Sequence, residues 1–565
     1  MTDTTMIASH PALALFAGAL LVVLLPGRPR AAAALAAPAA ALYLAFALPE
    51  GPLWTTHWLG MEIVPFAVDA LSRLFAIVFA LMALGGVLFA LNQPHRLELP
   101  AALVYAGSAI GVTLAGDLVT LFVFWESMAI ASTLVLWSAR SPAAYRASMR
   151  YLMVHLLGGM LLFAGVTGHV LDTGTTAFTV MSIDTLSGKL ILAAFLVNAA
   201  AWPVSAWLPD AYPEASWSGM VFLSAFTTKT AVYVLLRGYP GTELLIYVGL
   251  AMVFYGIIYA LLENDMRRIL AYSIVNQVGF MVTGVGIGTE MALNGAAAHA
   301  FTHILYKALL LMSAGSVLYA TGRRKCTDLG GLCHSMPLTA ACGIVGALAI
   351  SAFPLTSGFV SKSMISQAAG DEHLFVVWML LAAATAGVFL HAGIKFPWFV
   401  FFQKDSGLRP PEPPWNMRAA MLFFSALCIG LGIFYEPLYR LLPYAVEYQP
   451  YTAWHVVAQL QLLLFSGLAF FVMLGWLKRT LTITLDFDWL YRVFLPGAAS
   501  LATIVLMLMN SALSRIARSQ LELLSEAGRG LLGPRGIFAR TWPSGTMALG
   551  IMAMLCAFLA SYYFA

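Results

Sequence analysis

The sequence predicts an all-α polytopic membrane protein, and three observations support this fold class. Of the 565 residues, 61% are hydrophobic and only 10% are charged, whereas about 25% is usual for soluble domains. Apolar segments of about 20 residues, long enough to cross a bilayer, recur along the chain. No stretch between them has the composition of a soluble domain.

Sixteen such segments give the predicted helices. The first is expected to span the membrane rather than to be a cleaved signal peptide, because no lysine or arginine precedes its apolar run. Two segments contain an internal proline, Pro203 in VNAAAWPVSAWLPD and Pro354 in SAFPLTSGFVSK. Two proline-broken helices at separated positions suggest two repeated halves. The predicted helices are 8–25, 31–48, 66–91, 98–115, 118–137, 148–170, 188–207, 218–238, 243–262, 268–288, 292–319, 338–369, 374–402, 416–434, 455–476 and 545–563.

The distribution of basic residues predicts the topology, because short loops rich in lysine and arginine stay in the cytoplasm. With the N-terminus outside, residues 49–65 and 171–188, which lack lysine and arginine, also lie outside. The loops expected inside are GRPR (27–30), SARSPAAYRASMR (138–150), ENDMRR (263–268), TGRRK (321–325) and LKR (477–479).

Residues 490–540 allow two interpretations. VFLPGAASLATIVLMLMNS is apolar enough to span, but the five arginines of 514–540 would then lie outside, against the charge rule. Alternatively, the whole stretch lies along the cytoplasmic face as an amphipathic helix. The second interpretation agrees with the charge rule, so we predict that 514–540 faces the cytoplasm.

Two ionisable residues lie inside predicted spanning helices. Glu126 stands in LVTLFVFWESMAIASTLVLW, and Lys229 stands near the middle of SGMVFLSAFTTKTAVYVLLRG. A charge at the centre of a spanning helix costs about 2.5–3.5 kcal/mol on insertion scales, and such residues often mark proton or ion paths. The alternatives are a glutamate satisfied locally and a lysine that extends to the membrane interface. Their central positions favour a proton path.

A third group of titratable residues forms a stripe. His299, His303 and Lys307 occur in NGAAAHAFTHILYKALLLMS, and their spacing of four places them on one helix face. The stripe is about 12 Å long from the helical rise. Because histidine titrates near physiological pH, the stripe predicts a proton wire. The alternatives are core histidines with local partners and a metal site, for which no third ligand is evident.

Four further polar residues lie in or near predicted helices. Lys362 lies in the second broken helix and extends the predicted proton path. Asn198 lies in the first broken helix, where a neutral amide can hold water but carries no charge. His391 and Lys395 are one turn apart in LHAGIKFPWF. We treat Asn198, His391 and Lys395 as accessory positions.

The motifs of cofactor and nucleotide binding are missing from the sequence. The five cysteines form no CxxC pair, so we expect no iron–sulfur or zinc site. Neither GxGxxG nor GxxxxGK[ST] precedes a predicted helix. His155 and His169, 14 residues apart on one helix, have a bis-histidine haem spacing, but no second such pair lies within one segment. We expect no cofactor, no metal and no catalytic residue.

Five stretches together resemble one known family. They are FVFWESMAI, WPVSAWLPDAYPEAS, ENDMRRILAYSIVNQVGF, HAFTHILYKALLLMSAGSV and ISAFPLTSGFVSKSMI. They resemble the antiporter-like subunits shared by Mrp-type multisubunit Na+/H+ antiporters and respiratory complex I. The resemblance extends over roughly residues 60–435 and is strongest to the D subunit of the Mrp-type antiporter.

The resemblance implies a 14-helix core with two inverted repeats, two broken helices and a central row of charged residues. That row comprises Glu126, Lys229, His299, His303, Lys307 and Lys362. The family usually has a lysine where Asn198 stands, paired with the glutamate. Either Lys229 pairs with Glu126 through water instead, or the first half-channel is altered or inactive. Beyond the core, an amphipathic helix and a last spanning helix resemble a shorter form of the lateral arm of the largest antiporter-like subunit of complex I.

The resemblance further implies the function, the partners and the domain organisation. We expect a proton-translocating subunit of a multisubunit monovalent cation (Na+)/H+ antiporter in a bacterial inner membrane. The alternatives are a proton-pumping subunit of a complex I or hydrogenase-type redox complex, without its own redox centre, and a proton-conducting partner of an inorganic-carbon uptake complex. The expected partners are other membrane subunits, protons, Na+ and lipid, with no nucleic acid. The predicted divisions are 1–97 (N-terminal helices), 98–240 and 241–402 (two proton-channel-like repeats), 403–480 (C-terminal core helices) and 481–565 (amphipathic and terminal helices).

Overall fold

The computed structural model describes residues 9–475 and 486–564, and nearly all of their regular structure is helical. Thirteen helices in this part of the chain are long and apolar enough to cross a membrane. The described residues form two compact units that divide after Asp488. The elements are α2 (Pro11–Leu24), α3 (Gly27–Ala47), β1 (Gly51–Trp58), β2 (Met61–Val68), α4 (Ala70–Ala90), α5 (Glu98–Leu114), α6 (Leu118–Trp137), α7 (Pro142–Thr173), α8 (Leu186–Asn198), η1 (Val204–Ala206), α9 (Trp207–Ala211), η2 (Tyr212–Glu214), α10 (Gly219–Leu223), α11 (Thr227–Gly238), α12 (Leu244–Leu262), α13 (Met266–Ile287), α14 (Glu290–Thr321), η3 (Cys326–Asp328), η4 (Leu332–His334), α15 (Pro337–Ile350), α16 (Ser357–Asp371), α17 (Phe375–Val388), η5 (Phe389–Lys395), η6 (Trp398–Phe402), α18 (Trp415–Ile433), α19 (Glu436–Tyr439), α20 (Ala453–Val472), η7 (Leu490–Phe494), α21 (Leu495–Leu532), η8 (Ile537–Ala539) and α22 (Ser544–Phe564).

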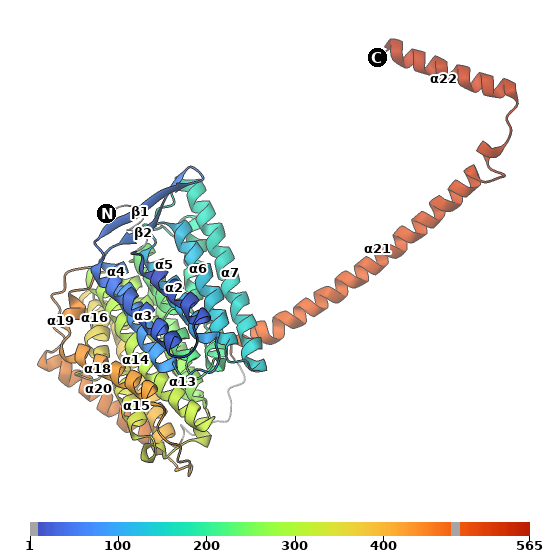
Figure 1. Cartoon of the computed structure of the whole chain (residues 1–565). Coiled ribbons are helices and arrows are strands. Elements are labelled where there is room, and N and C mark those ends of the chain that lie inside the picture. The colour runs from blue at the N-terminus through green and yellow to red at the C-terminus, as the bar shows by residue number, and fades with distance from the viewer. Residues whose placement is uncertain (1–8, 476–485, 565) are drawn as a thin grey trace. The chain divides into compact units, whose positions relative to one another are not determined.

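Helix α14 lies at the centre of the first unit (Figure 1). It packs against α13, α15, α16 and α18, and also contacts α4, α10 and α11. Almost every residue between Ala292 and Val317 is buried, so this helix has no polar outer face. A helix that is buried on all sides belongs to the core of a large bundle. The histidine stripe therefore lies inside the protein.

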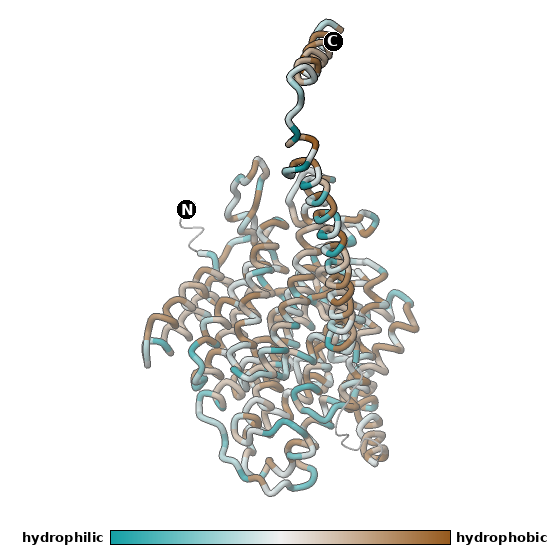
Figure 2. The backbone as a smooth tube through the Cα atoms, turned by 90° about the vertical axis from the view of Figure 1, so that its right-hand side faces the viewer, coloured by the Kyte–Doolittle hydropathy of each residue, from teal (hydrophilic) through white to brown (hydrophobic). Residues whose placement is uncertain are grey.

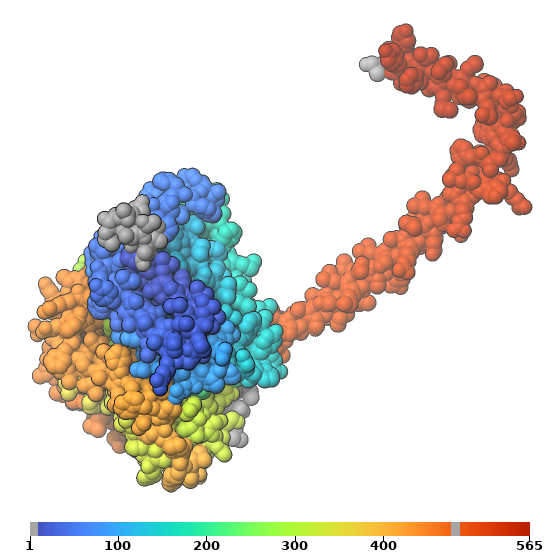
Figure 3. All heavy atoms as spheres, viewed as in Figure 1, coloured from blue at the N-terminus to red at the C-terminus, as the bar shows by residue number. Residues whose placement is uncertain are grey.

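The surface of the first unit fits a lipid environment. Large apolar side chains such as Leu20, Met153 and Phe163 are exposed on its outer helices. Along the chain, hydrophobic residues dominate the helices and hydrophilic residues gather in the connections (Figure 2). In space-filling form, the N-terminal helices, drawn in blue, cover one face beside the orange helices of residues beyond 400 (Figure 3). The outward apolar surface supports a multi-pass membrane protein.

Contacts in the first unit join loops that the charge distribution predicts on the same side of the membrane. At one end, Arg324 forms ion pairs with Glu214 and Asp265, which joins the 321–325 loop to the 263–268 loop. At the other end, the Thr176 hydroxyl donates to the Glu62 carbonyl at 2.7 Å, which joins the two segments expected outside. The predicted loop at 477–479 lies outside the described residues.

A β-hairpin occupies the connection between α3 and α4, where the sequence predicted a segment outside the membrane and a helix from residue 66. Strands β1 and β2 pair antiparallel around a turn at Leu59 and Gly60, both with positive φ. Alternating β-branched and aromatic residues such as those in WTTHW and EIVPF favour strands. Helix α4 begins only at Ala70, because Asp69 and Ser72 form a reciprocal capping box at its start.

The two predicted helix breaks are present and share one backbone feature. Helix α8 ends at Asn198 and the chain adopts a left-handed conformation at Ala200. Helix α15 ends at Ile350 and the chain does the same at Ala352. In both breaks the left-handed alanine follows the last helical residue by two positions. This similarity supports a repeated architecture, while the boundaries of the repeats stay predictions.

The second unit contains two long helices and is described by itself. Helix α21 has 38 residues, which corresponds to about 57 Å of helix. This is longer than the roughly 30 Å that a spanning helix needs. Helix α22, with 21 residues, corresponds to the predicted terminal spanning helix. The cytoplasmic placement of 514–540 stays a prediction.

Candidate functional site

Five residues of the predicted proton path are buried on neighbouring helices. The side chains of Lys229, His299, His303 and Lys307 are fully buried, and Lys362 is 2% exposed. They lie on α11, α14 and α16, and α14 packs against both of the other helices. The fold therefore brings together chargeable groups that are up to 133 positions apart in sequence, from 229 to 362.

Lys229 lies just after an interruption that the sequence analysis missed. The segment 218–238 was expected to be one helix, but α10 ends at Leu223 and α11 begins at Thr227. The Lys229 Nζ donates to the Ser224 carbonyl oxygen at 2.6 Å and to the Thr228 hydroxyl at 3.0 Å. The break frees this carbonyl from a regular helical bond, and the ammonium group occupies it. The break thus helps to offset the cost of burying Lys229.

The stripe on α14 is partnered at one end only. His299 contacts the Gln277 Oε1 through Nε2 at 3.1 Å and the Ser361 Oγ through Nδ1 at 3.2 Å. Both ring nitrogens of His303 and the Nζ of Lys307 are buried without a hydrogen-bond partner among the described residues. Buried polar groups normally have a protein or water partner. The unpartnered atoms therefore mark positions where water would be held.

Lys362 borders a cavity of about 1020 Å³. Its Nζ lies 4.3 Å from the centroid of the Phe280 ring, a cation–π distance. The cavity is also lined by Glu290, Asp371 and Glu447. Glu290 begins α14, whose other end leads to the 321–325 loop, so the cavity lies toward the end predicted to be outside.

Glu126 and Asn198 both lie against α7. A Cβ atom at Gly159 would come within 1.9 Å of the Glu126 Oε1, and a Cβ at Gly158 would lie 3.6 Å from the Asn198 Oδ1. Glu126 Oε1 and both amide atoms of Asn198 have no hydrogen-bond partner among the described residues. In this part of the chain, no hydrogen bond or ion pair joins Glu126 directly to Lys229. The water-mediated pairing of these two residues stays a prediction.

The two accessory residues near α17 have different surroundings. His391 lies in the π-helical turn η5, where its Nδ1 contacts the Gly387 carbonyl at 2.9 Å. The Nζ of Lys395 donates to the carbonyl oxygens of Ala260, Leu261 and Glu263 at 3.2, 2.5 and 2.6 Å. These are the orphan carbonyls at the end of α12. Lys395 therefore acts as a helix cap.

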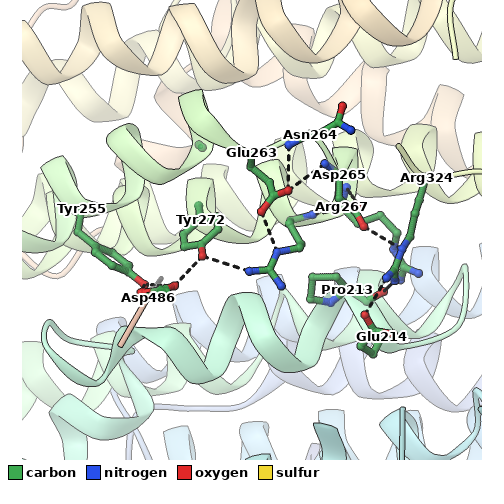
Figure 4. Close-up of polar contacts among 12 residues, drawn as sticks. Pro213, Glu214, Tyr255, Glu263, Asn264, Asp265, Arg267, Tyr272, Arg324 and Asp486 are labelled. Atoms are coloured by element: carbon green, nitrogen blue, oxygen red, sulfur yellow. Dashed lines mark hydrogen bonds and ion pairs between the residues drawn. The ribbon is translucent and has the colours of Figure 1, made fainter. Parts of the chain in front are cut away.

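A polar network at the predicted cytoplasmic end was missed by sequence reasoning (Figure 4). The Asp486 carboxylate accepts hydrogen bonds from Tyr255 and Tyr272, and Tyr272 also accepts one from Arg268 at 3.3 Å. Arg268 in turn forms an ion pair with Glu263 at 2.9 Å. From the sequence, ENDMRR indicated only a basic loop. Its link to Asp486 runs through Tyr272, and Asp486 lies more than 200 residues further along the chain.

The central part of the chain matches a known protein family. Residues 115–389, which contain all six predicted proton-path residues, match the family model described as NADH:quinone oxidoreductase/Mrp antiporter, TM. This match, together with the relatives and solved structures below, supports an antiporter-like membrane subunit of the Mrp and complex I type.

Two curated relatives of this antiporter-like chain have names that describe parts of cation antiporters. The chain is 28% identical over 414 residues to the D subunit of the Na(+)/H(+) antiporter of Alkalihalophilus pseudofirmus, a match that covers 68% of the chain and 83% of the relative. It is 31% identical over 357 residues to the A/B subunit of the probable K(+)/H(+) antiporter of Rhizobium meliloti. That match covers 59% of the chain but only 36% of the relative, so the chain spans about a third of that longer protein.

Solved structures show the same fold. One chain of the Mrp complex from Dietzia sp. DQ12-45-1b has a TM-score of 0.64 and 23% identity, covering 77% of the present chain and 92% of its own. One chain of the membrane-bound sulfane sulfur reductase, an archaeal respiratory membrane complex, has a TM-score of 0.72 and 24% identity, covering 98% and 99%. The predicted fold class is therefore confirmed.

The antiporter-like chain has a second polar cluster beside its first helix break. The His155 ring is buried on α7, stacks on Tyr151 at 3.9 Å and packs against Trp207 at 4.6 Å. The Tyr151 hydroxyl donates to Ser132 at 2.9 Å and lies 3.4 Å from the Thr227 hydroxyl. From the sequence, His155 was a candidate only for haem ligation, because its contacts with Trp207 depend on tertiary structure.

Proposed function

We propose that this chain is a proton-translocating subunit of a multisubunit monovalent cation/H+ antiporter and that it works beside other membrane subunits in a bacterial inner membrane. The observation that supports this most strongly is the set of buried, chargeable side chains on α11, α14 and α16. Several of their polar atoms have no partner among the described residues. Such groups are costly in a membrane protein and are usually retained for function.

In the proposed mechanism, protons move along this row by short transfers. A proton that reaches Glu126 weakens its attraction for Lys229 through intervening water. Lys229 then interacts more strongly with His303 and Lys307 on α14, which packs against α11. Lys362 is the next station, and the cavity beside it gives access to the outer side. Movement of charge along the row couples the two halves.

The cation is proposed to be Na+, which this chain would exchange for protons together with its partner subunits. The names of two relatives support a monovalent cation, since one belongs to a Na(+)/H(+) antiporter and the other to a probable K(+)/H(+) antiporter. Both are named as subunits, which supports assembly with other chains.

A second candidate is a proton-pumping subunit of a respiratory redox complex. The full-length likeness to one chain of the sulfane sulfur reductase favours it, because that likeness covers 98% of the present chain, including the second unit. This support concerns the fold alone. In this case electrons would pass through partner subunits, and the chain would contribute the same proton path.

The two candidates can be distinguished in everted membrane vesicles that contain the chain together with the products of its neighbouring genes. For an antiporter, adding Na+ or K+ to respiring vesicles collapses the pH gradient, read by acridine orange fluorescence. Lys362→Met should abolish this response, whereas Lys189→Met, the same change at an exposed lysine on α8, should preserve it. A wild-type complex that acidifies vesicles with a redox substrate but ignores both cations would support the second candidate.

A further inference from the structure

The first half of the proton path contains a histidine that the row described above does not use. His155 is 1% exposed and lies on α7, between the helices that carry Glu126 and Asn198. Gly158 and Gly159 follow it by three and four positions, so all three share one face of the helix. These two glycines are the points at which Asn198 and Glu126 approach α7. The face of α7 that carries His155 thus meets both residues.

The hydrogen bonding of His155 leaves one nitrogen free. Its Nδ1 lies 2.9 Å from the Tyr151 carbonyl oxygen. A carbonyl accepts, so Nδ1 carries the hydrogen and the Nε2 of the neutral ring has a free lone pair. That Nε2 is buried without a hydrogen-bond partner among the described residues. The large majority of buried polar side-chain atoms have a protein or water partner.

The neighbours of His155 place it beside the first helix break. The Trp207 ring packs on it, and the Trp207 Nε1 donates to the Val197 carbonyl at 3.0 Å, next to Asn198. The other polar neighbours are Tyr151 on the same helix, Glu126 on α6 across Gly159, and Tyr212 beside Tyr151. Arg150, the charged residue of α7 closest to His155 in sequence, forms an ion pair with Asp210 at 2.7 Å.

Hydroxyl groups near this histidine also approach the start of α11, the helix that carries Lys229. The Tyr151 hydroxyl approaches Thr227, whose hydroxyl is also 2.5 Å from the Tyr105 hydroxyl. Thr227 begins α11, and its neighbour Thr228 accepts a hydrogen bond from the Lys229 Nζ at 3.0 Å. Hydroxyl groups in such a row can orient water between two titratable groups. The same row links α7, α5 and α11.

We propose that His155 relays protons between Glu126 and Lys229, an inference that rests on the proposed function. Its Nε2 accepts the proton released by the Glu126 carboxylic acid through water, which leaves a carboxylate and an imidazolium. After Lys229 has passed its own proton to the stripe on α14, the same Nε2 gives its proton to the neutral Lys229 amine, which restores the neutral ring and leaves an ammonium group. Asn198 holds the water at the junction and carries no proton itself.

The test uses the assembled complex in everted vesicles and measures cation-driven collapse of the pH gradient. His155→Gln keeps a side chain that can hydrogen bond but cannot carry a proton, and should reduce the initial rate at least tenfold without reducing the yield of assembled complex. His169→Leu changes a histidine at the far end of α7 and should keep the wild-type rate. Asn198→Lys introduced into the His155→Gln protein supplies a new proton carrier beside Gly158 and should restore part of the rate.

Different outcomes separate the relay from the proposed function. If His155→Gln keeps the wild-type rate while Lys362→Met is inactive, the relay is wrong and the proposed function stands. If His155→Gln is inactive and Asn198→Lys gives no recovery, His155 has a structural role and the relay is again wrong. If the wild-type complex shows no response to any monovalent cation and no redox-driven acidification, both the function and the relay are overturned.

Discussion

Removing the Asp486 carboxylate should loosen the segment 486–488 from the end of α12 and α13. This carboxylate is 8% exposed and accepts hydrogen bonds from the Tyr255 hydroxyl at 2.8 Å and the Tyr272 hydroxyl at 2.6 Å. A hydrogen bond to a charged group contributes about 1.5–3 kcal/mol, so the two bonds together contribute about 3–6 kcal/mol. Burial raises the pKa of Asp486, with the tyrosine hydrogen bonds opposing this, so desolvation offsets part of that sum. We expect a net loss of about 2–3 kcal/mol for Asp486→Ala.

This loss corresponds to a roughly 30- to 150-fold increase in the equilibrium constant for detachment of the segment. Hydrogen exchange of the backbone amides of 486–488 in the detergent-solubilised complex measures it directly, because exchange follows local opening. Tyr255→Phe removes one of the two bonds and should give a smaller increase. Tyr247→Phe, the same change at an exposed position of α12, should give none. An increase below about twofold for Asp486→Ala would refute the anchoring role.

The remaining predictions concern three other parts of the chain. Glu126→Gln and Lys229→Met should each abolish cation-driven proton movement. The double variant should assemble better than either single variant but stay inactive. Strictly additive losses in complex yield would show that the two residues do not pair. A cysteine at Ser525 should react with an impermeant maleimide only from the cytoplasmic side, and labelling from outside would place α21 across the membrane. Arg267→Ala should lower the melting temperature of the complex, with a stability loss of about 3 kcal/mol. The reason is that Arg267 donates hydrogen bonds to the carbonyls of Ala215 and Ser216 at 2.8 Å each. An unchanged melting temperature would contradict this structural role.

The sequence alone predicted the helical class and the burial of five residues of the row, whereas Glu126 is half-buried. Both follow from a local signal, an ionisable residue such as Lys229 or His303 within an apolar window about 20 residues long. The prolines at 203 and 354 similarly marked two helix breaks. These signals are reliable because the bilayer penalises charged side chains and unpaired backbone wherever they occur in the fold.

The parts that sequence reasoning missed depend on contacts between distant residues. The break between α10 and α11 contains neither proline nor glycine, since it runs Ser224–Ala225–Phe226. Instead, two tertiary contacts occur at this break. The Lys229 ammonium binds the Ser224 carbonyl, and Phe226 packs against Phe79 and Tyr105. The partners of Asp486 are likewise more than 200 positions away. No periodicity within a single window contains such information.

The three backbone contacts of Lys395 affect how mutants of this protein should be interpreted. A lysine in the middle of a membrane protein invites the assumption that its loss stops proton flow. Here one ammonium group binds the carbonyl oxygens at the end of α12. A Lys395 variant would therefore release that end and destabilise the fold, whether or not Lys395 carries protons. Arginine at this position keeps the charge and the donors, and alanine keeps neither. Comparing the amounts of assembled protein for these two replacements would therefore show whether Lys395 stabilises the fold or carries protons. A structural role predicts normal assembly with arginine and reduced assembly with alanine.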